Sequence, residues 1–155
     1  MSKVLVSYFS TSGNTKSVAE KLAAAINGDL FEIEPVDEYA PEDLDWMNSQ
    51  SRASIEINEN IRPEITKKIP NINEYKTICI GSPIWWDREP TIIDKFLEEN
   101  DMTGKKIFVF VTSGSSGIDN AYSNLQKTFP NLNFVKGKRF SGIETEDEYI
   151  SWIGR

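Results

Sequence analysis

Residues 4–15 read VLVSYFSTSGNT, an apolar run that passes into a turn of hydroxyl and amide side chains before a helical segment begins. The start of a helix leaves several backbone N–H groups unpaired and carries the positive end of the helix dipole, so it can bind an anion. The turn adds polar donors and a glycine that permits close approach to the backbone: Ser10, Thr11, Ser12, Gly13, Asn14 and Thr15. The stretch fits a phosphate-binding turn, although a strand, an ordinary Ser or Thr cap and a helix would also explain it.

This turn departs from two common nucleotide-binding motifs. It lacks the earlier glycine of G-x-x-x-x-G-K-[ST], which disfavours a triphosphate, and it lacks G-x-G-x-x-G, which disfavours a dinucleotide pyrophosphate. Residues 10–15 contain no positive charge and would bind through hydroxyl and amide groups. These properties favour a terminal monophosphate.

Apolar runs and helical patterns alternate along the chain. Predicted strands cover residues 3–9, 30–35, 76–81 and 105–111, with short candidates at 132–135 and 138–140. Predicted helices cover residues 14–27 and 91–100, a segment after residue 117 with Ile118, Ala121 and Leu125 on one face, and a short final segment with capping-box spacing at Thr145 and Glu148. Gly28 is expected to end the first helix. The acidic residues 36–73 show only broken periodicity, with short helices expected near 43–54 and 62–69.

This alternation predicts an α/β protein with a doubly wound, five-stranded parallel sheet, strand order 2-1-3-4-5 and helices on both faces. We expect one domain over residues 1–155. In such sheets ligands bind beyond the carboxyl ends of the strands, near the switch point of the strand order. Three loops rich in Gly, Ser, Thr or Trp converge there, at residues 10–15, 81–89 and 112–117.

The second of these loops contains two adjacent tryptophans, Trp85 and Trp86. Neighbouring side chains in extended backbone point opposite ways, so both are unlikely to pack in one core. We expect one indole to pack and the other to offer a stacking face for a flat ligand. The small residues of the third loop would bring backbone amides close to a ligand edge, with a second phosphate site or a plain flexible loop as the alternatives.

Composition excludes several classes of chemistry. The formal net charge is −7, and 11 of the 24 acidic residues lie between Asp29 and Glu64, where only Arg52 and Arg62 are basic. This disfavours nucleic acid and anionic membranes and favours a basic protein partner, although solubility alone would explain it. The chain has no histidine and one cysteine, Cys79 in an apolar strand, so we expect no metal site and no catalytic side chain. Redox chemistry would come from a bound cofactor.

No apolar run approaches the length of a membrane span, and the N-terminus runs straight into a predicted strand. A cytoplasmic location is the default expectation.

The three loops resemble those of the flavodoxin family, in the bacterial branch with S-x-x-G-N-T, G-[SY]-P-I-W-W and T-S-G-x-S-G loops. They stand here at residues 10–15, 81–86 and 112–117, and the similarity covers nearly the whole chain. The resemblance implies the flavodoxin fold and bound flavin mononucleotide (FMN). It implies that the turn at 10–15 holds the phosphate and that two loops contact the isoalloxazine ring through Pro83, Ile84, Trp85, Trp86, Ser113, Gly114 and Gly117, with Trp85 as the stacking residue.

The chain departs from the family pattern in two places. Its third loop has no aromatic residue, because Tyr122 lies well inside the following helix, so one face of the ring would be more open than usual. Relatives often have Gly after the tryptophan pair, where this chain has Asp87. A flexible peptide there can rotate to hydrogen-bond flavin N5, and Asp tolerates positive φ less well than Gly.

The resemblance implies an electron-transfer protein that cycles bound FMN between redox states and docks redox partner proteins, which we expect to present basic surfaces. The first alternative is an FMN-dependent NAD(P)H:quinone reductase on the same fold, for which the open ring face would admit a substrate. The second is a flavin-free binding module, because a fold alone does not fix a function.

Overall fold

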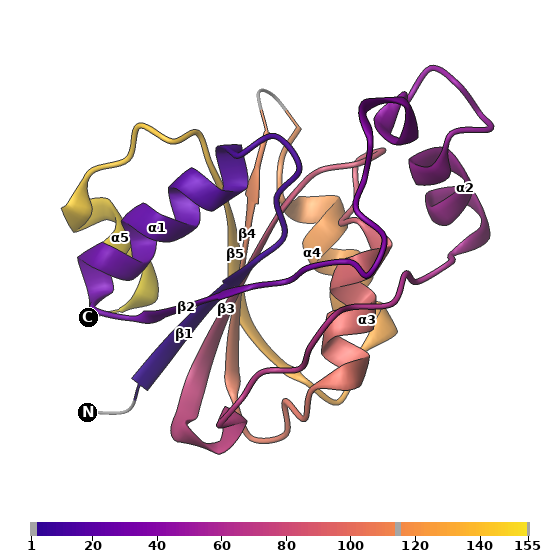
Figure 1. Cartoon of the computed structure of the whole chain (residues 1–155). Coiled ribbons are helices and arrows are strands. Elements are labelled where there is room, and N and C mark those ends of the chain that lie inside the picture. The colour runs from indigo at the N-terminus through magenta and orange to yellow at the C-terminus, as the bar shows by residue number, and fades with distance from the viewer. Residues whose placement is uncertain (1–2, 114–115, 155) are drawn as a thin grey trace.

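The computed structural model describes residues 3–113 and 116–154, which form a central sheet between two layers of helices (Figure 1). The sheet consists of β1 (Lys3–Tyr8), β2 (Asp29–Glu32), β3 (Tyr75–Pro83), β4 (Lys106–Thr112) and β5 (Asn133–Phe140). The α-helices are α1 (Asn14–Ile26), α2 (Arg52–Glu59), α3 (Thr91–Glu99), α4 (Asp119–Thr128) and α5 (Glu146–Ile153), and the 3-10 segments are η1 (Pro41–Leu44) and η2 (Ile72–Glu74). All pairings within the sheet are parallel and the order is β2-β1-β3-β4-β5, which confirms the predicted topology.

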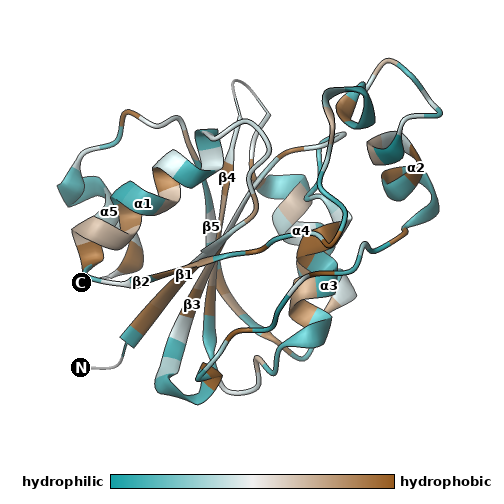
Figure 2. Ribbon diagram, viewed as in Figure 1, coloured by the Kyte–Doolittle hydropathy of each residue, from teal (hydrophilic) through white to brown (hydrophobic). Residues whose placement is uncertain are grey.

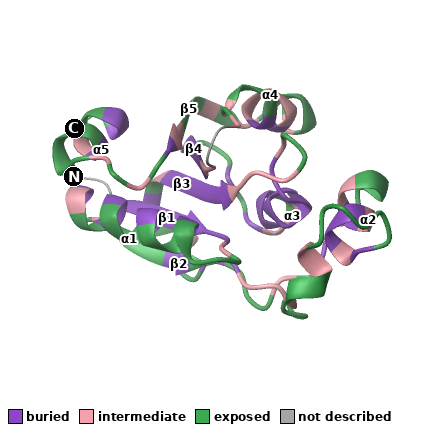
Figure 3. Cartoon of the chain, turned by 90° about the horizontal axis from the view of Figure 1, so that it is seen from above, coloured by how far each residue is buried: buried purple, intermediate pink, exposed green. Residues whose placement is uncertain are grey.

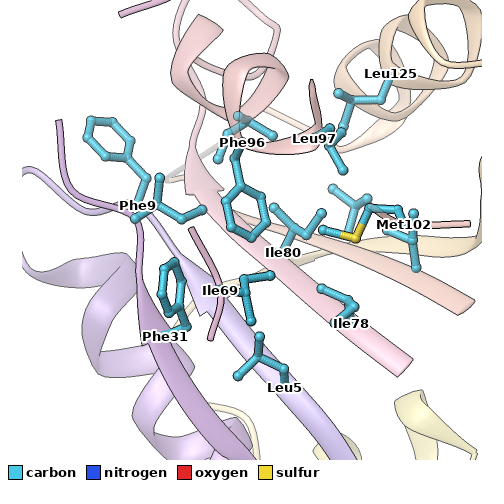
Figure 4. Packing of buried hydrophobic residues seen from close by; sticks show 14 of the residues in the cluster. Leu5, Phe9, Phe31, Ile69, Ile78, Ile80, Phe96, Leu97, Met102 and Leu125 are labelled. Carbon is cyan, nitrogen blue, oxygen red and sulfur yellow. The ribbon is translucent and has the colours of Figure 1, made fainter. Parts of the chain in front are cut away.

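The helices cover both faces of the sheet, with α1 and α5 on one side and α3 and α4 on the other (Figure 1). Alternate residues of each central strand therefore enter different cores. In β4, Phe108 and Phe110 pack toward α1 and α5, whereas Ile107 and Val109 pack toward α3. Figure 2 shows that the apolar segments of the strands lie in the centre of the molecule, between the helices. Figure 4 shows the hydrophobic core between the sheet and α3.

The two edges of the sheet carry opposite charges. The edge strand β5 presents three cations, of which Lys136 and Lys138 are exposed and Arg139 is half-buried. The other edge strand, β2, is short and presents exposed Asp29 and Glu32. Charged side chains on edge strands disfavour the addition of another strand from a second molecule.

Two predicted element boundaries are wrong in informative ways. Asn27, not Gly28, takes the left-handed conformation that ends α1, with φ 55°. A Cβ on Gly28 would lie 3.1 Å from the backbone oxygen of Val4, so the glycine permits a close approach to β1 instead. The short strand candidates at 132–135 and 138–140 form one strand, β5, whose register against β4 shifts between Ile107 and Phe108.

The acidic segment after β2 also differs from the prediction. The expected helix near 43–54 is replaced by η1 and by α2, which begins after the Ser51 cap. No helix forms at 62–69, because backbone groups there bond to residues 34–36: Val36 N donates to Glu64 O, and Thr66 N donates to Glu34 O, each at 2.9 Å. In Figure 3, α2 stands apart from the sheet, beyond α3. Within residues 3–113 and 116–154, no helix has the length and apolar character needed to cross a bilayer.

Gly81 makes room for the buried ring opposite it in β4. A Cβ at this position would lie 2.0 Å from Cζ of Phe110, which is fully buried. We expect Gly81→Ala to lower the free energy of unfolding by about 1–3 kcal/mol, since a packed ring can move only by disturbing its neighbours. Urea-induced unfolding measures this, with Gly117→Ala as the control because its Cβ meets nothing within 4 Å. Equal midpoints for the two variants would contradict the packing argument.

Candidate functional site

Three loops follow β1, β3 and β4 and lie at the same end of the sheet (Figure 1). Two hydrogen bonds join them beyond the strand ladder. Phe9 N donates to Gly81 O at 2.9 Å, and the hydroxyls of Thr15 and Thr112 are 2.7 Å apart. The topology thus brings the three predicted loops into one region.

The first loop leaves the N-terminus of α1 open to an anion. The helix begins after Gly13, whose φ is 91°, and no side chain of the described residues caps it. Its first turn contains no acidic residue that would repel an anion at the helix start. Ser10 Oγ accepts the Gly13 N–H at 3.0 Å, which leaves its own proton available. Residues 11–14 are exposed, whereas Thr15 is buried against the third loop.

The second loop is a tight hairpin whose two central residues have left-handed backbone. Trp85 N donates to Arg88 O at 2.9 Å, and Arg88 N donates back to Trp85 O at 3.1 Å. Between them Trp86 has φ 50° and Asp87 has φ 62°, as in a type I′ turn. Left-handed backbone costs a non-glycine residue about 1–2 kcal/mol. Asn120 Nδ2 donates to the Asp87 carboxylate, which ties the turn to α4.

The two tryptophans have different surroundings. The Trp85 ring is half-buried and makes edge contacts with Phe9 and Tyr39, at centroid distances of 5.7 and 5.4 Å. Trp86 is 43% exposed. Trp85 is therefore held in a fixed orientation, as a stacking platform requires, and its assignment as the stacking residue stays a prediction.

The third loop is anchored through Ser113, which is half-buried. Its backbone oxygen accepts from Arg139 Nη1 at 2.9 Å, and its hydroxyl donates to Ser116 O. Gly117 is exposed, and Gly114 lies outside the described residues. The Tyr122 ring packs against the Phe134 ring instead of facing the loop, with 6.1 Å between the two ring centroids.

Three of the predicted ring-binding residues line a cavity of about 770 Å³. Ile84, Trp85 and Trp86 line it from the second loop, and Ser116 lines it from the third. Asn14 and Ser113 line a separate hollow of about 330 Å³, whereas Ser10 and Thr11 line one of about 180 Å³. Pro83 is half-buried at the end of β3, and Asp87 is exposed.

Sequence reasoning missed one wall of the large cavity. Leu44, Trp46 and Ala53 line it from the acidic segment between β2 and β3. Their spacing follows no helix or strand period, because they belong to η1, a turn and α2. The one available signal was an isolated tryptophan in a strongly acidic stretch.

A buried charged network supports the second loop from behind. Glu89 and Asp94 are each 1% exposed, and Glu89 Oε2 lies 2.9 Å from Arg88 Nη2. Asn124 Nδ2 donates to both Glu89 oxygens, at 2.9 and 3.1 Å. Arg88 and Arg62 each approach Asp94 Oδ2 to 3.6 Å. The network links the loop to α3 and α4.

Burial raises the pKa of Asp94 above its ordinary value of 3.8, and the neighbouring Glu89 carboxyl raises it further through a hydrogen bond and its charge. The positive charges of Arg88 and Arg62 lower the pKa of Asp94, but by less than burial and Glu89 raise it. Asp94 Oδ1 has no donor facing it in the described part of the chain, and a proton on Asp94 lets it donate to Glu89 instead. The raised pKa favours the protonated, neutral form of Asp94 at neutral pH.

This proton makes stability depend on pH. The folded chain keeps it at pH values where the unfolded chain has released it, so the free energy of unfolding falls as pH rises above about 4. The fall is at most roughly 1.4 kcal/mol per pH unit. Asp94→Asn keeps a neutral side chain and should remove this slope, so its stability relative to wild type rises from pH 5.5 to 8.5. Urea unfolding across that range is the measurement, with Glu59→Gln as the exposed control outside this network. Parallel profiles for wild type and Asp94→Asn would refute the proton on Asp94.

Comparison with known proteins agrees with this arrangement. A family model described as flavodoxin matches residues 3–155. No curated protein matches the chain significantly. Two crystal structures of candidate flavoproteins superpose well over 99% of this chain. The one from Bacteroides eggerthii has 44% identity, a TM-score of 0.95 and 96% of its own length covered. The one from Bacteroides uniformis has 41% identity, a TM-score of 0.93 and 99% covered.

A third structure, a flavoprotein from Lactobacillus acidophilus crystallised in complex with FMN, has 27% identity and a TM-score of 0.77, with 99% of each chain covered. The family match spans almost every residue and agrees with the strand order and the three loops. The chain belongs to the flavodoxin family.

Proposed function

We propose that this chain binds FMN and transfers electrons through it. The observation that carries the proposal is the uncapped N-terminus of α1, which lies at the same end of the sheet as a cavity lined by Trp85 and Trp86. A phosphate suits the first feature and a planar aromatic ring suits the second. FMN joins both groups in one molecule, and a related flavoprotein has been crystallised with it.

Each loop has a role in this proposal. The turn at 10–15 donates backbone and hydroxyl hydrogens to the phosphate, and Thr15 fixes that turn against the third loop. Ile84, Trp85 and Trp86 line the ring, while Ser113 and Gly117 lie on the loop that approaches its edge. When bound, the flavin supplies the redox chemistry, and the protein supplies binding, orientation and electric field.

The acidic segment supports a carrier that docks a basic partner. Glu38, Glu42 and Asp45 are exposed, and Leu44 of the same segment lines the large cavity. The negative charges lie beside the site, where they disfavour extra negative charge on a reduced flavin and attract cationic surfaces. A cytoplasmic location remains an expectation from the sequence.

The phosphate turn predicts strong preference for FMN over riboflavin. Without the phosphate, several donors of residues 10–15 lose a charged acceptor, at about 1.5–3 kcal/mol per bond. We expect the dissociation constant of riboflavin to exceed that of FMN by at least about 100-fold. Fluorescence titration of the apoprotein measures both constants.

Ser12→Ala provides an internal check, because Ser12 is exposed in the turn. It should weaken FMN binding and leave riboflavin binding unchanged. Comparable constants for the two flavins would refute the phosphate assignment. Failure of wild type to bind either flavin would favour the flavin-free binding module.

The quinone reductase is the second candidate, because residues 112–117 offer no aromatic side chain that would cover one face of the flavin ring. The carrier predicts slow direct turnover with NADPH and quinone, and fast reduction by a ferredoxin- or flavodoxin-type reductase. Electrostatic steering raises association rates by about 10–1000-fold and is screened beyond ~10 Å at 0.1 M salt. Stopped-flow reduction should therefore slow as salt rises.

The double variant Glu42→Gln, Asp45→Asn tests the electrostatic steering. It should make the rate of reduction by the partner less dependent on salt. Glu146→Gln combined with Asp147→Asn removes two exposed charges from α5 and serves as the matched control. A rate independent of salt would remove the steering argument. Rapid, saturable NADPH–quinone turnover by the chain alone would instead support the reductase.

A further inference from the structure

Trp46 is an exposed indole on a hydrogen-bonded turn. Its side chain is 71% exposed, although large apolar rings normally lie inside proteins. Hydrogen bonds hold the backbone on either side: Met47 N donates to Asp45 Oδ1, and Asn48 N donates to Asp45 O, each at 3.1 Å. A single exposed apolar side chain is normal on a protein surface, so the position of Trp46 at the edge of a cavity carries the argument.

The indole lines the large cavity from the acidic segment, together with Leu44 and Ala53. Trp85 and Trp86 line the same cavity from the second loop. Three tryptophans from two segments far apart in the sequence therefore surround one hollow. Indoles offer flat faces that suit a planar aromatic ligand.

The acidic segment is tied to the second loop, so this wall has a defined position. The Tyr39 ring contacts the Trp85 ring at 5.4 Å, and the Arg52 guanidinium lies 3.9 Å from the centroid of Tyr39. Arg52 Nε donates to buried Glu56 at 3.0 Å, and Arg52 Nη1 donates to Asp37 O at 2.7 Å. The Tyr39 hydroxyl donates to Glu56 as well.

The third loop provides no aromatic side chain that could cover the flavin ring. Residues 112–117 contain no aromatic side chain, and Tyr122 is packed on Phe134. A Cβ on Gly137 would lie 2.8 Å from the Tyr122 ring, so that ring rests directly on β5. Among the described residues, Trp46 is the aromatic side chain outside the second loop that lines the cavity.

We propose that Trp46 is a flavin-binding residue that supplies the second aromatic wall of the isoalloxazine site. The acidic segment thereby both carries the negative surface and covers the ring. This inference rests on the proposed binding of FMN. It assigns ring coverage to a part of the chain that precedes α2, rather than to the loop after β4.

Trp46→Ala tests the proposal, with Met47→Ala as the matched control. Met47 is the next residue, is 78% exposed and is absent from the cavity lining. We expect Trp46→Ala to raise the dissociation constant of FMN by about 3–10-fold and Met47→Ala to leave it unchanged. Trp46→Phe retains an aromatic ring and should restore most of the affinity.

Two further measurements separate ring contact from a folding defect. Bound flavin should fluoresce more strongly in Trp46→Ala, because a neighbouring indole quenches it, and iodide should quench that fluorescence more steeply because the ring is less covered. Thermal unfolding of the apoproteins should be the same for wild type, Trp46→Ala and Met47→Ala, since both side chains are exposed.

The outcomes distinguish this inference from the function on which it rests. Equal FMN affinity, flavin fluorescence and iodide quenching for wild type, Trp46→Ala and Met47→Ala would overturn the role of Trp46 alone. Failure of wild type to bind FMN would overturn the proposed function and this role with it. Loss of affinity in Trp46→Ala, with recovery in Trp46→Phe, supports both.

Discussion

The parallel register of β1, β3 and β4 is the constraint on which the rest of the molecule depends. Parallel pairing places the carboxyl ends of all three strands at the same end of the sheet, so the loops that follow them lie close together. A slip of one residue would exchange the two faces of a strand, sending Phe108 and Phe110 toward α3. The bonds from Phe9 to Gly81 and from Thr15 to Thr112 extend the register into the loops.

Most of the fold could be predicted because its signals are local. Strands buried on both faces read as continuous apolar runs, and α1 shows its period in Val18, Leu22 and Ile26. The turn at 10–15 was likewise visible as a short pattern at a strand end. These elements need only neighbouring residues to be recognised.

The parts that could not be predicted depend on contacts between distant residues. The helix expected at 62–69 fails because the backbone there pairs with residues 34–36. Trp46 reaches the cavity because Tyr39 and Arg52 fix its segment against Trp85. The period of apolar residues indicates which face of one helix or strand is buried. It does not indicate which loop a turn far away in the sequence will contact.

The two edge strands carry opposite charges, so the charge distribution across the sheet is asymmetric. Lys136, Lys138 and Arg139 stand on β5, whereas Asp29 and Glu32 stand on β2, with three strands between them. A charged body that approaches therefore exerts a torque as well as a net attraction, since it pulls one edge and repels the other. An asymmetric field of this kind favours some orientations of the molecule over others at first contact.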